Sequence, residues 1–321
     1  MQLIKPVLIA IAMQMSTAAI AADAVTFRLN WYIVGLHAPF LYGKERGFYK
    51  DEGIDLTINE GRGSISTAQV VAAGTDQFGF ADSSSVVMVA AKGGEIRSVM
   101  SLLNTSPFAV VSRADSNIRS PKDLEGKRLA LAQGDPFFQL FGAMAAVNKL
   151  DTSRITMVQV DPAGKTVSVL EKRADALLGS IDDQYYALKH RGVEPAALRF
   201  SDHGVDLVGF TVFAHNSVIK SKPDVVRRFV KASVRAWEEA RKNPNAAIDA
   251  AMKAKPDLNR QALFDQLSSD LPLLESKNSK GRIGWGAQAD WERTLNILKT
   301  YRDVKTDQGW GFFHTNEFLP K

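Results

Sequence analysis

The stretch that decides the fold is residues 26–58, which read TFRLNWYIVGLHAPFLYGKERGFYKDEGIDLTI. The chain enters it as a short apolar strand at residues 25–29 and continues through a loop of polar and aromatic side chains. A helix is predicted over residues 39–49, ending in the region of Gly47, and residues 54–58 alternate apolar and polar positions as a second strand does. A strand, a helix and a strand in this order predict a βαβ unit and hence a parallel sheet.

The same alternation continues on both sides of a strand predicted at residues 107–113. Before that strand, we expect strands at residues 77–81 and 96–103 and helices at residues 64–73 and 83–91. After it, we expect strands at residues 128–132, 155–160 and 174–178 and helices at residues 136–148, 164–172 and 182–191. The chain then returns through a strand at residues 207–214, followed by helices at residues 244–253, 259–267 and 287–301 and a strand-like piece at residues 310–313.

This order predicts an α/β protein of two lobes, each a mainly parallel sheet flanked by helices, with the second lobe inserted into the first. The expected division is a signal peptide at residues 1–21, the first part of lobe 1 at 22–112, lobe 2 at 113–206 and the return to lobe 1 with the C-terminal helices at 207–321. Two crossings, near Ser112 and near Asp206, would form the hinge between the lobes.

The first residues have the three parts of a secretory signal. Lys5 supplies the positive start, residues 6–15 are an apolar run, and residues 19–21 read AIA, a small-x-small cleavage site. We therefore expect cleavage after Ala21 and a periplasmic mature protein. The apolar run is too short to span a membrane, which takes about 20 apolar residues, and a chain without cysteine cannot carry a lipid on that residue, so no stable membrane insertion is expected.

Charge and composition exclude several functional classes. The chain has 40 Lys and Arg against 35 Asp and Glu, interleaved throughout rather than gathered in the basic block that marks nucleic-acid binding. Its five histidines are scattered without metal-ligand spacing, no Gly-x-Ser-x-Gly motif occurs, and the GRGS of residues 61–64 lacks the Gly-Lys-Ser ending of a P-loop. We therefore predict no metal, no cofactor and no catalytic residue, and we expect a monomer that binds a small molecule.

Ligands of open α/β sheets sit outside the carboxyl ends of the strands, and this rule selects the candidate binding residues. They are Asn30, Trp31, Tyr32, His37, Arg62, Ser64, Asp82, Ser83, Gln133, Asp135, Asp161 and Asp182. Near the same predicted cleft lie three further aromatic residues, Phe108, Phe137 and Tyr185. Rings of this kind can stack with a flat heterocycle.

Several of these residues have a second interpretation that the sequence leaves open. Ser64, Ser83 and Asp135 precede helices and can serve as plain N-caps. Asp82 either caps a helix or accepts hydrogen bonds from a ligand amine. Arg62 either pairs with an anionic ligand or points into solvent. His37 is either part of the site or a structural histidine.

Five motifs carry a resemblance to a known family. They are residues 30–32 (NWY), 37–39 (HAP), 47–54 (GFYKDEGI), 78–82 (FGFAD) and 120–127 (SPKDLEGK). The chain resembles the type 2 periplasmic substrate-binding proteins of ABC importers, above all those that bind the thiamine pyrimidine precursors hydroxymethylpyrimidine and formylaminopyrimidine. The alkanesulfonate, taurine and nitrate binders are related to this group. The resemblance implies capture of a pyrimidine-like heteroaromatic solute between the lobes and transient docking on an ABC permease in the inner membrane. A sulfonate or nitrate ligand is the alternative.

The same superfamily includes an enzyme that makes the thiamine pyrimidine and uses a cysteine-rich motif. The chain has no cysteine, so the motif is absent and the enzymatic interpretation is disfavoured. His37 lies where that enzyme places a reactive histidine, which keeps the alternative open. A sensor domain with the same fold is a third hypothesis, and it would need a separate signalling partner.

Overall fold

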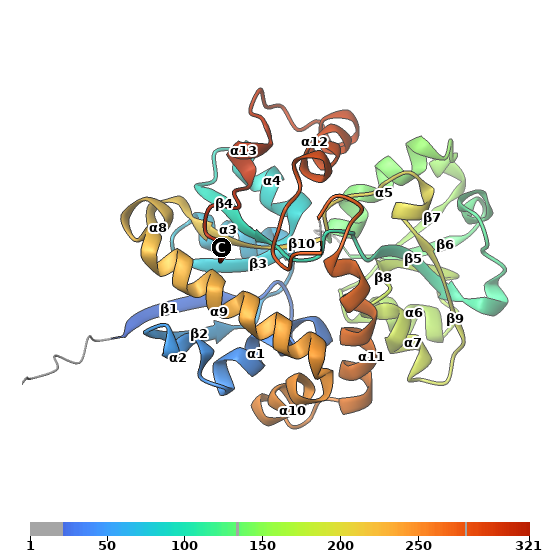
Figure 1. Ribbon diagram of the computed structural model, residues 1–321. Coiled ribbons are helices and arrows are strands. Elements are labelled where there is room, and N and C mark those ends of the chain that lie inside the picture. Colours follow the sequence, from blue (N-terminus) through green and yellow to red (C-terminus); the bar gives the residue numbers. More distant parts are fainter. Residues whose placement is uncertain (1–21, 133–134, 280) are drawn as a thin grey trace, which may run out of the picture.

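A computed structural model describes residues 22–132, 135–279 and 281–321 (Figure 1). The predicted signal peptide and Gln133 lie outside these ranges. The chain forms two five-stranded sheets, one in each lobe, and Figure 1 shows the two lobes side by side. We call the lobe that holds the N-terminal strand the first lobe and the other the second lobe.

The sheet of the first lobe has the strand order β2-β1-β3-β10-β4. Its strands are β1 (Asp23–Arg28), β2 (Ile54–Asn59), β3 (Phe78–Asp82), β4 (Ile96–Ser101) and β10 (Phe210–His215). Strand β1 pairs in parallel with β2 and β3, whereas β10 is antiparallel to both β3 and β4. The apolar side chains that predicted these strands are buried in the core, among them Phe27, Phe78 and Phe80.

The sheet of the second lobe repeats this plan in the order β7-β6-β8-β5-β9. Its strands are β5 (Phe108–Arg113), β6 (Arg128–Leu131), β7 (Thr156–Gln159), β8 (Ala176–Ser180) and β9 (Pro195–Arg199). Strand β5 runs antiparallel to β8 and β9, and the remaining pairings are parallel. Each sheet is therefore mixed: four strands point one way and one is reversed, so half of the pairings are antiparallel.

The helices cover both sheets and extend into a C-terminal group. In the first lobe they are α1 (Ala38–Glu45), α2 (Phe48–Asp51), α3 (Ser64–Ala72), α4 (Ser83–Ala91), α8 (Asn216–Ser221) and α9 (Pro223–Lys242). In the second lobe they are α5 (Pro136–Val147), α6 (Gly164–Leu170) and α7 (Gln184–Lys189). The C-terminal group consists of α10 (Pro244–Ala254), α11 (Arg260–Asp270), α12 (Gln288–Arg302) and α13 (Trp310–Phe313), and Figure 1 shows α11 and α12 next to the second lobe.

Four sequence-based expectations differ from the structure. Ser112 lies inside β5, a strand of the second sheet, so the first crossing falls between β4 and β5 and not near Ser112. Strand β9 was not expected, because its sequence PAALR has neither β-branched residues nor alternation. Residues 310–313 form the helix α13 rather than a strand. The helix expected at residues 39–49 is divided by Gly47, whose φ of 77° separates α1 from α2.

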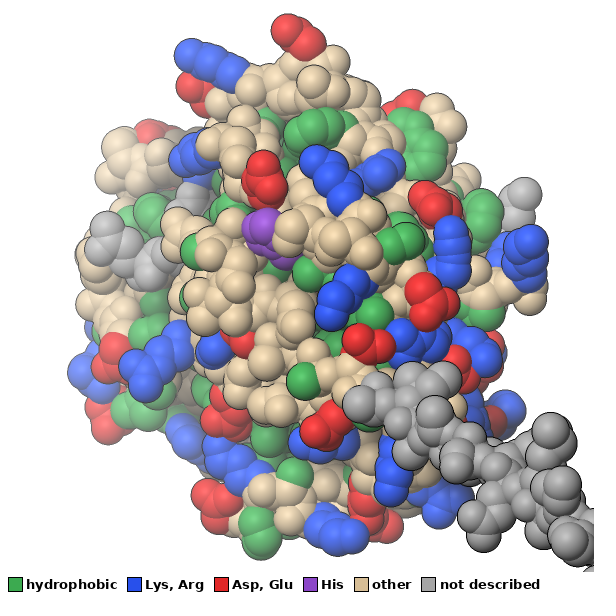
Figure 2. All heavy atoms as spheres, turned by 90° about the vertical axis from the view of Figure 1, so that its left-hand side faces the viewer, with side chains coloured by type: hydrophobic (Ala, Val, Ile, Leu, Met, Phe, Trp, Pro, Cys, Tyr) green, Lys and Arg blue, Asp and Glu red, His purple; other side chains and the backbone are tan. Residues whose placement is uncertain are grey.

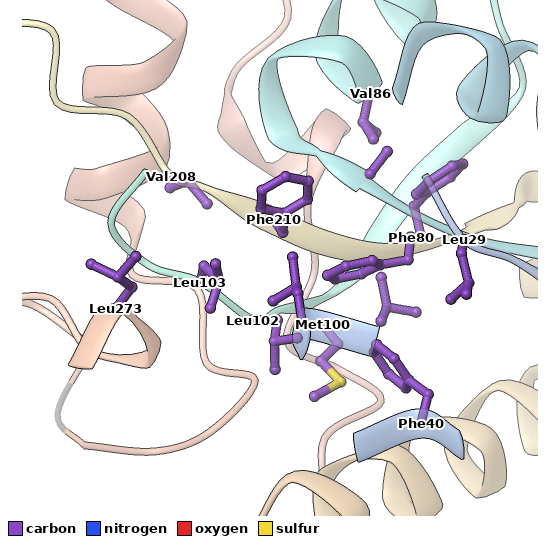
Figure 3. Packing of buried hydrophobic residues seen from close by; sticks show 14 of the residues in the cluster. Leu29, Phe40, Phe80, Val86, Met100, Leu102, Leu103, Val208, Phe210 and Leu273 are labelled. Atoms are coloured by element: carbon purple, nitrogen blue, oxygen red, sulfur yellow. The ribbon is translucent and has the colours of Figure 1, made fainter. Parts of the chain in front are cut away.

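The two crossings lie side by side in the core beneath the cleft. Leu102 N–H and Leu103 N–H donate to the carbonyl oxygen of Phe210, at 2.9 and 3.0 Å, and Gly209 N–H donates to that of Leu103 at 2.8 Å. A Cβ at Gly209 would lie only 2.8 Å from the Thr105 carbonyl oxygen, so glycine permits this approach. Figure 3 shows Leu102, Leu103 and Phe210 in one apolar cluster, and the cluster joins the two lobes at their crossings.

The surface carries charges of both signs. Figure 2 shows Lys and Arg interleaved with Asp and Glu over one face of the molecule. Among residues 22–132, 135–279 and 281–321, no helix combines the length and the apolar character needed to cross a membrane.

Candidate functional site

A pocket lies where the carboxyl ends of the strands of the two lobes face each other. From the first lobe it is lined by Asn30, Trp31, Val34, Leu36, His37, Gly63, Ser64 and Phe210. From the second lobe it is lined by Asp135, Pro136, Phe137, Lys165, Ser180, Asp182, Asp183 and Gln184. Its cavity volume is about 50 Å³, on a measure in which one water takes about 10–15 Å³.

His37 is buried at the first-lobe wall, and both of its ring nitrogens are occupied. Nδ1 accepts a hydrogen bond from Val34 N–H at 3.2 Å, so the ring proton is assigned to Nε2, which donates to Asn30 Oδ1 at 2.8 Å. Burial lowers the pKa of His37 to about 3, so the ring is neutral near neutral pH. Because Oδ1 of Asn30 is taken, its amide offers the NH₂ group to a ligand.

Lys165 and Asp135 form a buried ion pair in the second-lobe wall, with 1% and 7% of their side chains exposed. Lys165 Nζ also donates to the Leu178 carbonyl oxygen at 3.0 Å and lies 4.6 Å from the centre of the Phe137 ring. Burial raises the pKa of Asp135, while the adjacent Lys165 ammonium acts to lower it. The lysine charge is therefore compensated inside the wall before any ligand arrives.

Asp182 and Asp183 follow strand β8 directly and add two further carboxylates to the pocket. Asp182 is buried, and its Oδ1 has no hydrogen-bond partner among the described residues. Burial, followed by the charge of Asp182, raises the pKa of Asp183 to about 7. Gln184 Nε2 donates to Asp183 Oδ2 at 2.5 Å. The lining thus holds three carboxylates against one ammonium, and an uncompensated buried carboxylate favours a cationic or proton-donating ligand.

Aromatic rings supply the apolar part of the lining. The Trp31 ring lies 5.0 Å from that of Tyr32, and its buried Nε1 has no acceptor of good geometry among the described residues. Across the cleft, the Phe137 ring packs edge-on against Phe108 at 4.7 Å. Phe210 forms the floor and stacks on Phe80 at 5.4 Å. A flat ring between such walls gains stacking as well as apolar burial.

The structure brings together seven of the residues selected from the sequence. These are Asn30, Trp31, His37, Ser64, Asp135, Phe137 and Asp182. It places the following residues outside the lining: Tyr32, Arg62, Asp82, Ser83, Phe108, Asp161 and Tyr185. Gln133 lies outside the described residues.

Three of the residues outside the lining serve the backbone. Asp82 is the N-cap of α4 and accepts a hydrogen bond from Ser85 N–H at 3.0 Å. Of its two interpretations, the helix cap is the one that matches this contact. Ser83 Oγ donates to the Val208 carbonyl oxygen at 2.5 Å, which fastens α4 to the second crossing. Asp161 is exposed and accepts from Gly164 N–H at 2.8 Å at the start of α6.

The other four are either exposed to solvent or packed elsewhere in the protein. Arg62 is exposed. Tyr32 stands beside Trp31 with 40% of its surface exposed. Phe108 is buried behind Phe137, and Tyr185 packs against the small apolar cluster of the second lobe.

Sequence reasoning missed the residues that most affect the charge and shape of the pocket. Asp183 and Gln184 follow Asp182, so extending the strand-end rule by two residues would have found them. Lys165 lies in the first turn of α6, where nothing in the sequence distinguishes it from a solvated lysine. Phe210 begins β10 and reads as a core residue. Within the described part of the chain, no three His, Cys, Asp or Glu side chains are arranged so that they could hold a metal ion.

Comparison with known proteins identifies the relatives of this chain. A 4-amino-5-hydroxymethyl-2-methylpyrimidine phosphate synthase of Legionella pneumophila is 26% identical over 300 residues, covering 92% of each chain. The formylaminopyrimidine-binding protein of Halalkalibacterium halodurans is 22% identical over 286 residues, covering 88% of this chain and 86% of its own length.

A solved structure shows the fold. The alkanesulfonate-binding protein SsuA of Xanthomonas axonopodis pv. citri, bound to MOPS, superposes with a TM-score of 0.70 at 14% identity, covering 92% of this chain and 98% of that one. The fold is thus that of the periplasmic binding proteins. The family model described as NMT1/THI5 like matches residues 35–247, about two thirds of the 321 residues. The chain therefore belongs to the NMT1/THI5-like family.

Proposed function

We propose that this protein is the solute-binding component of an ABC import system and captures a small, flat, amine-bearing heteroaromatic molecule between its lobes. One observation carries the proposal. The cavity has aromatic walls, and its charged lining consists of three carboxylates and a lysine that is already paired. Placed polar groups of this kind orient a ligand, while the apolar walls supply much of its affinity.

An aminopyrimidine matches these groups. Its exocyclic amine and a protonated ring nitrogen are adjacent donors, and a carboxylate such as that of Asp182 or Asp183 accepts both in a charge-assisted pair. The Asn30 NH₂ group can donate to an unprotonated ring nitrogen. The ring itself would stack against the aromatic part of the lining, which includes Trp31 and Phe137.

The cavity size favours a single ring. Its 50 Å³ corresponds to three to five waters, and at about 30 Å³ of liquid volume each these occupy roughly 100–150 Å³. That is comparable with the volume of one substituted six-membered ring. A fused polycycle would require a wider separation of the lobes.

The charge of the pocket opposes an anionic ligand. Lys165, the sole cation among the described lining residues, is compensated by Asp135, and Arg62 points into solvent. A sulfonate or nitrate placed beside Asp182 and Asp183 would meet repulsion without a matching cation. The likeness to the alkanesulfonate-binding protein, at 14% identity, therefore supports the fold and not its ligand.

We expect the mature protein to act in the periplasm after cleavage of the signal peptide. There, closure of the two lobes on the ligand would be the first step of transport. A ligand held by both lobes favours the closed state by the difference between its affinities for the closed and open forms. The two crossings beneath the cavity would absorb the hinge motion. The closed, loaded form would then dock on the membrane permease.

A second candidate function rests on the name of the Legionella relative, a pyrimidine phosphate synthase. In this chain both ring nitrogens of His37 are hydrogen-bonded, and the cysteine-rich motif of the enzyme is absent. If the protein were such an enzyme, iron or pyridoxal phosphate should raise its melting temperature. We expect neither to do so.

A thermal-shift screen tests the proposal, with aminopyrimidines, alkanesulfonates and nitrate as probes and calorimetric titration of each hit. We expect stabilisation by aminopyrimidines and none by the anions. Stabilisation by alkanesulfonates or nitrate alone would overturn the acidic-cavity argument.

A further inference from the structure

Helix α11 is fixed to the first-lobe wall of the pocket. It packs on the short helix η1 (Gly35–His37), whose last residue lines the cavity. A Cβ added to Gly35 would lie 2.4 Å from the Leu263 carbonyl oxygen and 2.6 Å from Gln266 Cβ, so the two segments are in direct backbone contact. Any displacement of α11 is therefore transmitted to the wall that holds His37.

Gln266 of α11 reaches across the cleft from this position. Its Oε1 accepts a hydrogen bond from Gly35 N–H at 2.8 Å, which fixes the orientation of the amide. Nε2 is consequently a donor, and it lies 3.4 Å from Asp183 Oδ1 of the second lobe. With Gln184 Nε2 on Oδ2, the Asp183 carboxylate is held by one amide from each lobe.

The same helix meets the second lobe at two further points. Asp265 Oδ2 lies 3.0 Å from His190 Nε2 at the end of α7. Asp270, at the other end of α11, is fully buried, and neither of its carboxylate oxygens has a hydrogen-bond partner among the described residues. Burial raises the pKa of Asp270 well above its ordinary value, and the charges of Asp182 and Asp183 add to this. Helix α11 thus contacts the second lobe through Gln266 and Asp265, and Asp270 lies close enough to Asp182 and Asp183 to be affected by their charges.

We propose that Gln266 is a positioning residue that holds the Asp183 carboxylate ready for the amine of the ligand, so that the charge of the site depends on contact between the lobes. This inference rests on the proposed function, because it assigns Asp183 to an amine-bearing ligand. Loss of the Gln266 donor by itself favours the protonated form of Asp183, because the hydrogen bond stabilises the ionised carboxylate.

The surroundings of Asp183 make this dependence measurable near neutral pH. The charged and titratable groups that face it are Asp182 on its own loop, Asp135 and Lys165 at α5 and α6, Tyr32 after β1 and Asp270 on α11. Most of them are acidic, and the pKa of Asp183 is raised to about 7. A donor that favours the ionised form therefore changes the protonated fraction under physiological conditions.

Gln266→Met tests the proposal, since it keeps the size of the side chain and removes both hydrogen bonds. The matched control is Gln69→Met, at an exposed position of α3. Carboxyl carbon NMR of the ligand-free protein follows the titration of Asp183 directly. Because the contact is long, at 3.4 Å, we expect its loss to raise the pKa of Asp183 by about half a unit, with no change in the control. Gln266→Glu keeps the acceptor for Gly35 N–H and should raise this pKa further.

Ligand binding provides the second arm, with benzamidine as a cationic ring and benzamide as its neutral isostere. Benzamidine should bind more tightly as the pH rises through about 7 in the wild-type protein, and Gln266→Met should move this midpoint upward. An unchanged Asp183 titration in Gln266→Met, or a loss of affinity with an unmoved midpoint, would show a merely structural glutamine. Failure of the wild-type protein to bind either ring would instead count against the proposed function, because the NMR titration needs no ligand.

Discussion

Asp183→Asn should stabilise the ligand-free protein at neutral and alkaline pH. The substitution removes one of three carboxylates gathered in a desolvated pocket and keeps the shape of the side chain. In the folded protein, burial and the charge of Asp182 raise the pKa of Asp183 from 3.8 to about 7. The ionised form of Asp183 is therefore destabilised in the folded state, and the neutral asparagine does not carry this cost.

The size of the effect follows from the pKa. The pKa of Asp183 rises by about three, and at about 1.36 kcal/mol for each pKa unit this corresponds to about 4 kcal/mol. Because the Asp183 side chain is only half-buried, solvent screening reduces this figure to about 2 kcal/mol. Asparagine has one acceptor oxygen where the carboxylate has two, so the bond from Gln184 or Gln266 is weakened at a cost of about 0.5–1 kcal/mol. We expect a net gain of about 1–1.5 kcal/mol at pH 8.

The sign of the pH dependence follows from linkage. A group whose pKa is higher in the folded than in the unfolded state stabilises fully below its unfolded pKa, here about 4, and that stability is lost as the pH rises through about 7. The free energy of unfolding of the wild-type protein should therefore fall between about pH 4 and about pH 7. In Asp183→Asn the contribution of this carboxylate to the fall should be absent. Near pH 4 only the weakened hydrogen bond remains, so the variant should there be slightly less stable.

Urea unfolding at about pH 4, 6 and 8 measures these differences, since the free energy falls linearly with denaturant. Asp55→Asn is the matched control, at an exposed position of β2, and it should change little at any pH. If Asp183→Asn altered the free energy of unfolding by the same amount at about pH 4 and about pH 8, the carboxylate would not be under the strain that we infer.

Three further substitutions test the lining itself. Trp31→Ala should weaken aminopyrimidine binding at least about tenfold, because a stacked ring contributes about 0.5–1.5 kcal/mol beyond its buried area; unchanged calorimetric affinity would remove Trp31 from the site. Lys165→Met should lower the free energy of unfolding by about 3–5 kcal/mol, because the Asp135 charge is left buried and alone, and adding Asp135→Asn should restore most of the loss in urea unfolding. Arg62→Ala should leave aminopyrimidine affinity within about twofold, as expected for an exposed side chain, and a loss of sulfonate binding in this variant would contradict our assignment.

The order of strands and helices could be predicted because it depends on local patterns. Within the motif of residues 120–127, Ser120 and Asp123 stand three residues apart and form a local capping box, with Ser120 N–H donating to Asp123 Oδ2 at 2.8 Å. Strand β5 was also expected, but its sheet was not. Its residues are buried almost throughout, and such a strand has the same sequence pattern in whichever sheet it enters. Only its pairing with β8 and β9 assigns it to the second lobe.

The sequence identified residues at strand ends, but it could not show which of their side chains line the cavity. Ser64 and Ser83 both start a helix after a strand, yet Ser64 lines the cavity while Ser83 is bonded to the carbonyl oxygen of Val208. The distinction depends on the second crossing, which lies more than a hundred residues further along the chain. Asp82 likewise combines a strand end with a cap, and the structure directs it to Ser85 N–H.

The charge of the site is a tertiary property, and for that reason the sequence alone left the ligand class open. Read in isolation, Lys165 would be a cation available to a sulfonate. Its partner Asp135 stands 30 residues earlier, at the start of another helix, and their contact converts the lysine from a ligand-binding group into part of a neutral wall. Once Lys165 is neutralised, the carboxylates after β8 decide the sign of the pocket. On our proposal, an amine-bearing solute is then favoured over an anion.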